Sequence, residues 1–278
     1  MAASSSVASD PGFLRLLLSR RSVIVALIVF LVIAGLCILA GWVAPMSPSK
    51  MSVRARLAPP FGDYLLGADA YGRDVLSRLL YAGRTSLTIG FGVATLSTVI
   101  GIAIGLLAGF FRRLDAPLSR LIDAMMAFPD ILLAIALVSI LGGSMVNVIL
   151  ALSIVYVPRF ARISRASTLV IRELPFVEAS RALGSSTRYV IVNHVLRNIV
   201  SPITVQATFI FAYAMLAEAG LSFLGVGIDP ATPTWGTMIN EGRQFIDQAT
   251  WLIVFPGLAI SISVLSLQII GDGLRDAL

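Results

Sequence analysis

Long uncharged, apolar runs alternate with shorter polar stretches along this sequence. The runs occupy residues 23–44, 85–111, 131–158, 198–217 and 249–271. A helix needs about 20 apolar residues to cross a bilayer, so each run can form at least one span. The pattern predicts an all-α membrane protein.

The run at residues 131–158 decides the number of crossings, because it is long for one span and short for two. A single crossing would put the arginine-rich stretch 159–197 outside the cell, against the preference of positive loops for the cytoplasm. Two crossings, with a turn at Gly142, Gly143 and Ser144, put that stretch inside. We therefore expect six transmembrane helices with both termini cytoplasmic, which places most of the 21 arginines and lysines inside.

Two crossings require charged residues in the cytoplasmic part of the third helix. Arg120, Asp123 and Asp130 must then face protein or an aqueous cleft. Pro129 should kink this helix. Three arginines that follow the run 131–158 stand at helical spacing and favour a role in topology or lipid headgroup contact over substrate contact: Arg159, Arg162 and Arg165.

These runs and the polar stretches between them give the expected organisation of the chain. The segments are a cytoplasmic N-terminal segment 1–22, a first helix 23–44, an extracytoplasmic loop 45–84 with an amphipathic surface helix, a core 85–271 of five helices with a cytoplasmic loop at about 172–198, and a cytoplasmic tail 272–278.

Composition supports a membrane protein and argues against several other classes. The chain is 57% hydrophobic and 13% charged, with a mean hydropathy of +0.91. No basic cluster interleaved with aromatics accompanies the net charge of +6, which argues against nucleic-acid binding. Cys37 and His194 are the only residues of their types, so we expect no metal site and no catalytic set. Lys50, the single lysine, does not belong to a phosphate-binding GxxxxGK loop, so the sequence carries no motif of this kind for ATP.

Three glycines predict a close contact between helices. Gly101, Gly105 and Gly109 repeat at every fourth position and therefore lie on one face of the helix at 85–111. Small-residue faces let membrane helices approach closely, because hydrophobicity does not drive helices together in lipid.

The segment 178–202 predicts a short helix, a glycine corner and a second helix. Residues 178–183 are good helix formers, and Gly184 can take the left-handed conformation that closes a helix. Residues 185–187 are suitable caps for the next helix. From local sequence alone, the segment is also compatible with an amphipathic helix at the membrane interface.

This segment resembles the "EAA" loop of permease subunits in bacterial ATP-binding-cassette importers. Ser180 stands at the third position of the triplet, and Arg197 replaces a frequent proline. In that family the loop sits in a groove of the cytoplasmic ATPase and transmits its motion to the membrane helices. The resemblance rests on Glu178, Ala179, Ala182, Gly184, Ile191, His194, Leu196 and Pro202. It implies ATPase coupling for Glu178, Ala179, Ala182, Leu183, Gly184 and His194.

Further motifs resemble the dipeptide and oligopeptide branch of these permeases. They are LLGADAYGRDVLSRLLYAGR with Ala68 for the usual threonine, RLIDAMMAFPDILLAI, the stretch LSFLGVGIDPATPTWG after Glu218, and the ending GDGLRD. The resemblance implies an extracytoplasmic gate or receptor contact at Asp69, Gly72, Arg73, Asp74, Glu218 and Trp235.

Plainer interpretations of the same residues remain open. The stretch LLGADAYGRDVLSRLLYAGR can be an ordinary solvated loop. Glu218 closes the fifth span and can equally pair with backbone amides of the following loop, which is expected to dip back between helices. Trp235 and Trp251 would flank the outer membrane interface, where tryptophan is favoured.

The resemblance implies a type I importer transmembrane domain that forms half of a pore in the bacterial inner membrane. The implied partners are a homologous second permease, two ATPases that carry ATP and Mg, and an extracytoplasmic substrate-binding protein, with no cofactor in this chain. Di- or oligopeptides are the expected substrate, and nickel chelates, glycosides or opines are alternatives. An ion-coupled secondary transporter would need ionisable groups or broken helices near the midplane, and a structural scaffold would show no nucleotide-dependent motion.

Overall fold

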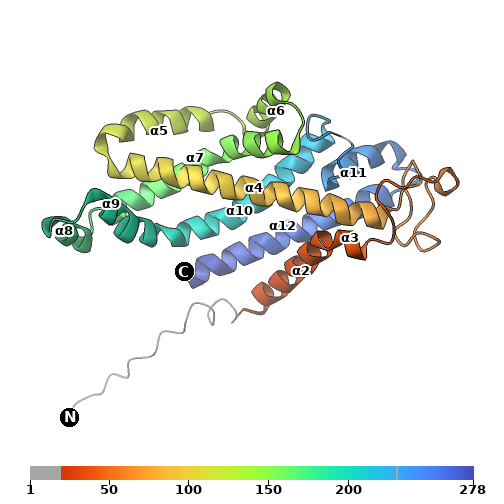
Figure 1. Cartoon of the computed structure of the whole chain (residues 1–278), viewed down its shortest axis with the longest axis horizontal. Coiled ribbons are helices and arrows are strands. Elements are labelled where there is room, and N and C mark those ends of the chain that lie inside the picture. The colour runs from red at the N-terminus through yellow and green to blue at the C-terminus, as the bar shows by residue number, and fades with distance from the viewer. Residues whose placement is uncertain (1–19, 230) are drawn as a thin grey trace, which may run out of the picture.

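The computed structural model describes residues 20–229 and 231–278, so nearly all of the expected segment 1–22 lies outside the described residues. In the described part every regular element is a helix (Figure 1). The elements are α2 (Arg21–Ile38), α3 (Ala40–Val43), η1 (Val53–Ala55), α4 (Val75–Phe110), α5 (Arg112–Met126), α6 (Asp130–Leu141), α7 (Met145–Ile171), α8 (Pro175–Ala182), α9 (Thr187–Tyr189), η2 (Val190–Leu196), α10 (Arg197–Phe223), α11 (Trp235–Gly242), η3 (Arg243–Phe245) and α12 (Trp251–Ala277).

Five helices of the described chain are long and apolar enough to cross a membrane. These are α2, α4, α7, α12 and the continuous stretch Thr187–Phe223. A sixth span results if α5 and α6 count as one, although they meet at an angle of 92°. The bend lies at residues 127–129, where Pro129 was expected to kink the helix. The structure thus has five spans of the six predicted, and the bent pair α5 and α6 occupies the place of the remaining one.

The spans lie side by side in an elongated bundle (Figure 1). The α8 segment lies at one end of the bundle, and α11 with the chain between α3 and α4 lies at the other (Figure 1). An ion pair between Arg20 and Asp276 joins the start of α2 to the end of α12. The turn between α6 and α7 contains Gly142 at φ +90° and Ser144, whose side chain caps α7 by accepting from the Asn147 amide.

Several helix boundaries differ from the sequence-based prediction. The first apolar run divides into α2 and α3, with a break at Leu39. Residues 75–84 do not form a separate surface helix but are the first turns of α4, because the Asp74 side chain caps the helix and one face of these turns is buried. The fifth span continues past Glu218 to Phe223, so this carboxylate lies within α10 and not at its end.

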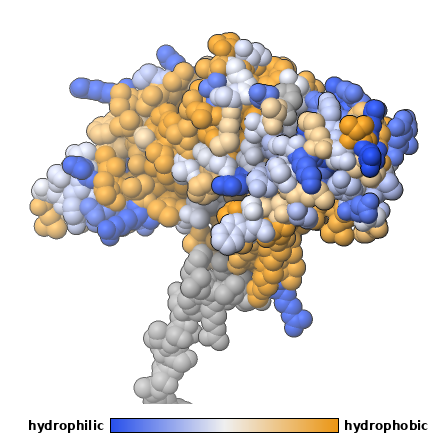
Figure 2. Space-filling view, turned by 45° about the vertical axis from the view of Figure 1, so that its right-hand side comes forward, coloured by the Kyte–Doolittle hydropathy of each residue, from blue (hydrophilic) through white to orange (hydrophobic). Residues whose placement is uncertain are grey.

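The exposed surface is apolar over large areas. Figure 2 shows hydrophobic residues over broad parts of the surface, with hydrophilic residues gathered mainly toward its margins. Val25, Ile140 and Leu265 are examples of large apolar side chains that are more than half exposed. Side chains of this kind need lipid or a partner protein around them, because helices crossing a bilayer present apolar surface outward.

Candidate functional site

The predicted helix, glycine corner and helix are formed by α8, Gly184 and α9. Helix α8 ends in a Schellman motif, in which the Ser185 amide donates to the Ser180 carbonyl at 3.1 Å and the Gly184 amide donates to the Arg181 carbonyl at 2.9 Å. Gly184 has a φ of +82°, which an L-residue adopts only with strain. Ser186 then caps α9 by accepting from the Tyr189 amide.

One face of α8 holds the segment in place, and the other face is open. Val177 and Ser180 are buried, and the Arg181 guanidinium lies 4.8 Å from the centre of the Phe110 ring at the end of α4. The predicted coupling residues Glu178, Ala179, Ala182, Leu183 and Gly184 are all exposed. Leu183 is 87% exposed, which is unusual for leucine at the tip of a well-anchored corner.

His194 is the predicted coupling residue that is not on this open face. Its ring lies 5.7 Å from the Phe176 ring and 5.6 Å from the Tyr189 ring, between α8 and α9. His194 therefore helps to fix the angle of the corner. It belongs to η2, a π-helix that joins α9 to α10 and that the sequence did not predict. π-Helical turns are rare and are frequently found at functional sites.

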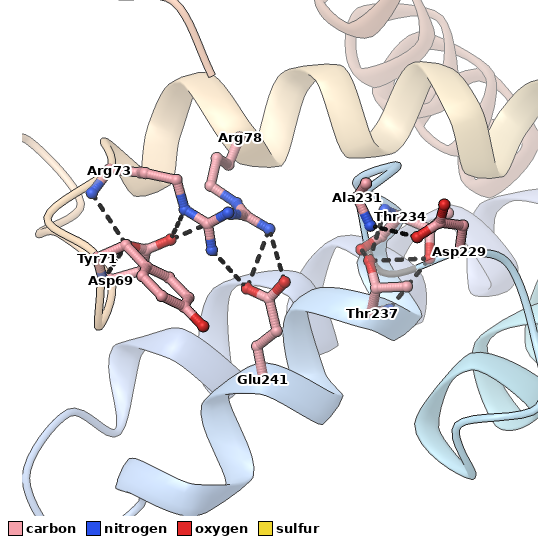
Figure 3. A network of polar contacts seen from close by, with 9 residues as sticks. All are labelled: Asp69, Tyr71, Arg73, Arg78, Asp229, Ala231, Thr234, Thr237 and Glu241. Atoms are coloured by element: carbon pink, nitrogen blue, oxygen red, sulfur yellow. Dashed lines mark hydrogen bonds and ion pairs between the residues drawn. The ribbon is translucent and has the colours of Figure 1, made fainter. Parts of the chain in front are cut away.

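The opposite end of the bundle carries a buried network of charges (Figure 3). Asp69 accepts from Arg73 Nε at 2.5 Å and from Arg78 Nη1 at 3.2 Å. Glu241 of α11 accepts from Arg73 Nη2 at 2.8 Å and from Arg78 Nη2 at 3.1 Å. Two arginines thus lie between two carboxylates, and they join residues 69–78 to α11.

Local turns place the members of this network. The other Asp69 oxygen accepts from the Tyr71 and Arg73 amides, at 2.8 and 2.9 Å. Gly72 has a φ of +68°, and a Cβ there would collide with the Ser52 carbonyl. Asp74 caps α4 by accepting from the Ser77 amide at 2.8 Å.

Sequence reasoning missed Arg78 and Glu241. Arg78 lies within the GRDVLSR motif and was a possible candidate, whereas Glu241 has no local signal and joins the network only through the fold. Burial raises the pKa of Glu241, and the positive charge of Arg73 opposes that shift. The network borders a cavity of ≈ 400 Å³ that Tyr71, Phe245 and Leu252 also line.

Glu218 and Trp235 are linked through Ser86 in the interior of the protein. Glu218 is 1% exposed and accepts from Ser222 Oγ at 2.8 Å and from Ser86 Oγ at 3.2 Å. Ser86 Oγ in turn accepts from the Trp235 amide at 3.2 Å. Hydroxyl groups, and not the backbone amides considered from the sequence, bond directly to this carboxylate.

Trp235 is 1% exposed, so its side chain packs inside the protein and does not contact the lipid interface. Its indole donates to the Leu79 carbonyl at 3.0 Å and lies against Gly83 of α4. Trp251 is partly buried and its indole donates to the Ala68 carbonyl at 3.3 Å. A capping box between Thr234 and Thr237 starts α11, and this fixes the helix that carries Trp235 and Glu241 (Figure 3).

Three ion pairs connect α7 to the bent pair α5 and α6. Arg165 Nε donates to Asp115 Oδ1 at 2.5 Å, and Arg162 Nη2 donates to Asp123 Oδ1 at 2.8 Å. Arg159 pairs with Asp130. The three arginines that were expected to fix topology or contact lipid headgroups are thus engaged with aspartates of the third span.

The glycine face of α4 lies against α7. A Cβ at Gly101, Gly105 or Gly109 would press on the Cβ atoms of Phe160, Ser164 and Thr168 respectively. Both sets of residues advance by four, so the two helices run parallel along this contact.

The described residues contain no group of three or more His, Cys, Asp or Glu side chains that could hold a metal ion.

The sequence matches two protein families. Residues 101–278 match the family described as binding-protein-dependent transport system inner membrane component. Residues 12–60 match the family described as the N-terminal TM domain of oligopeptide transport permease C.

Relatives of this chain are similar over most of their length. A putative peptide transport system permease protein of Brucella suis is 47% identical over 264 residues, which are 95% of this chain and 89% of the relative. A di/tripeptide transport system permease protein of Pseudomonas aeruginosa is 43% identical and covers 91% of this chain and 86% of the relative. A dipeptide transport system permease protein of Escherichia coli K12 is 42% identical, and the match covers 93% of this chain and 89% of the relative.

A solved structure shares the fold. A chain of the methionine ABC transporter MetNI, in an inward-facing conformation, superposes with a TM-score of 0.60 at 20% identity. The match covers 73% of this chain and 97% of the other.

Proposed function

This chain belongs to the binding-protein-dependent transport system inner membrane components, and we propose that it is a pore-forming subunit of an ATP-driven importer for di- or oligopeptides. The relatives named for dipeptides, di- or tripeptides and peptides support this substrate class. The multi-pass fold agrees with a site of action in the inner membrane.

The exposed corner at Gly184 carries the proposed mechanism. A rigid, capped corner with an open face at Glu178 and Leu183 can transmit a push from another protein, because its buried face is anchored at Val177 and Ser180. We assign this face to contact with an ATPase subunit. The contact must differ between the nucleotide states of the ATPase, since only differential binding can shift a conformational equilibrium.

The proposed assembly contains chains other than this one. It comprises a homologous second permease, two ATPase subunits that bind ATP and Mg, and an extracytoplasmic receptor that delivers substrate. Closure of the ATPases around ATP would move α8, and the motion would pass through η2 into α10 and open the outer side. Hydrolysis would then restore the inward-facing state.

The proposed topology puts α8 and both termini in the cytoplasm. Arg162 and Arg165 in the second half of α7 and the arginines of α8 and α9 lie toward this end, in agreement with the positive-inside preference. The network of Asp69, Arg73 and Glu241 would then face outward and brace the surface on which the receptor docks. In this proposal Glu218 and Trp235 form the packed layer beneath that surface.

The test is transport by the complete importer in proteoliposomes. We expect uptake of labelled alanyl-alanine that requires receptor and ATP, and that persists when the membrane potential is collapsed. Uptake driven by an ion gradient without ATP would overturn the proposal in favour of a secondary transporter. Uptake of a nickel chelate, glycoside or opine in place of peptides would overturn the substrate class but leave the importer assignment.

A further inference from the structure

One ion pair lies against two aromatic rings, whereas Arg73 of the network at the other end lies against one, that of Tyr71. Arg159, near the middle of α7, pairs with Asp130 at the first turn of α6. The Arg159 guanidinium carbon lies 5.4 Å from the centre of the Tyr156 ring and 5.6 Å from the centre of the Tyr213 ring. An arginine, a carboxylate and two phenol rings from three helices thus converge on one place.

This place lies at depth within the bundle. Arg159 follows the start of α7 at Met145 by a length of helix of roughly 20 Å, at about 1.5 Å per residue. Tyr213 precedes the end of α10 at Phe223 by roughly 15 Å of helix. Since the hydrocarbon core of a bilayer is about 30 Å thick, a position at this distance from the helix ends lies within the core, in the half nearer to α8.

Both charges are nevertheless accessible. The Arg159 side chain is 34% exposed and the Asp130 side chain is 41% exposed. A charged side chain that faces lipid at this depth costs about 2.5–3.5 kcal/mol or more, so such residues almost always face water or protein. The pairs Arg162 with Asp123 and Arg165 with Asp115 continue the row of charges along the seam between α7 and α5. This row indicates a water-lined face that extends toward the α8 end.

The cavity beside the pair has room for a small ligand. It has a volume of ≈ 260 Å³ and is lined by Asp130, Tyr156 and Tyr213, with Leu152 and Leu216 among its apolar walls. Arg159 does not line the cavity itself but contacts these three polar lining residues. The guanidinium can form a forked contact with a carboxylate. The aspartate can accept from an ammonium group, and the faces of the tyrosine rings attract cations. Apolar walls between these groups suit an aliphatic side chain.

We propose that Asp130, Arg159, Tyr156 and Tyr213 form a transient binding site for the two charged ends of a short peptide in transit. In the empty site the two charges neutralise each other. A zwitterionic peptide separates them and pairs with each, so the net charge of the site stays constant while the peptide is bound. The inference rests on the proposed function and adds a substrate contact within the membrane to it.

The test measures peptide binding to the purified complex of both permeases and both ATPases, with the receptor omitted. Saturation-transfer NMR of alanyl-alanine should give a signal with the wild type, and alanyl-alanine amide and N-acetyl-alanyl-alanine should give weaker signals. In Arg159→Gln the signal should fall about tenfold, as expected for loss of a charge-assisted contact. The matched variant Arg162→Gln should keep it, because Arg162 has no aromatic partners among the described contacts.

Assembly of each variant is checked by size-exclusion chromatography of the complex. If Arg159→Gln does not assemble, Tyr213→Ala replaces it, since that change removes one wall and leaves the ion pair. Any of three results would overturn the inference. The wild type could give no signal, the two arginine variants could give equal signals, or the blocked peptides could bind as well as alanyl-alanine. If one of these results is obtained while the wild type still imports alanyl-alanine, only the inference fails. Absence of wild-type uptake would instead overturn the proposed function.

Discussion

Gly109 of α4 lies so close to Thr168 of α7 that a Cβ at Gly109 would be 2.6 Å from the threonine Cβ. Real Cβ atoms essentially never approach to this distance. Gly101 and Gly105 meet α7 in the same way. The contact between these parallel helices therefore requires glycine at each position.

Replacement of Gly105 by alanine should destabilise the protein, because the new methyl group would also lie 2.6 Å from the Ala161 carbonyl oxygen. We expect a loss of about 1–3 kcal/mol, typical of overpacking in a close-packed contact. Thermal unfolding of the purified protein in detergent measures this loss of stability. Gly257→Ala is the control, since a Cβ there meets nothing within 4 Å. Equal melting temperatures for the two variants would contradict the packing described.

At Gly184 the cost of substitution should come from the backbone and not from crowding. A Cβ at this position meets nothing within 4 Å, but the φ of +82° disfavours L-residues by about 1–2 kcal/mol. Gly184→Val should therefore weaken receptor-stimulated ATP hydrolysis and uptake. Gly184→Asn should retain both, because asparagine tolerates the left-handed region. Unchanged uptake in Gly184→Val would remove the coupling role from this corner.

The buried carboxylate of Glu218 should tolerate an amide better than a hydrocarbon. Glu218→Gln keeps an acceptor for the hydroxyls of Ser86 and Ser222, which can rotate to match it. Glu218→Leu removes the acceptor of both hydroxyl hydrogens and should cost about 1–3 kcal/mol. Thermal unfolding and uptake are compared in both variants. If Glu218→Gln abolishes uptake without loss of stability, the charge itself takes part in transport.

The Glu241 network should impose a pH dependence on stability. Because burial raises the pKa of Glu241 in the folded state, protonation of this carboxyl stabilises the fold. That contribution is complete below the unfolded-state pKa and is lost as pH rises through the folded-state pKa. The stability of the wild type relative to Glu241→Gln should therefore fall as pH rises across this window. The control Glu173→Gln changes an exposed carboxylate and should show no such trend. If the stability of the wild type relative to Glu241→Gln instead rises with pH, the pKa of Glu241 is lowered in the folded state and the prediction is wrong.

The sequence by itself determined the features that depend on neighbouring residues. Apolar runs gave the spans, the glycines at every fourth position gave the packing face of α4, and Gly184 gave the corner after α8. Each follows from helix periodicity or from the conformational freedom of glycine, and both can be read along the chain. The turn at Gly142 was predictable in the same way, once the placement of positive charge was considered.

The tertiary structure alone decided which distant side chains meet. Glu241 reaches Arg73 and Arg78 only because α11 folds back against the start of α4, and Trp235 is buried for the same reason. Arg159 meets Asp130 because α6 turns sharply away from α5. Such contacts depend on the angles at which helices pack, which are set by complementary surfaces far apart in sequence. A list of charged residues does not contain that information.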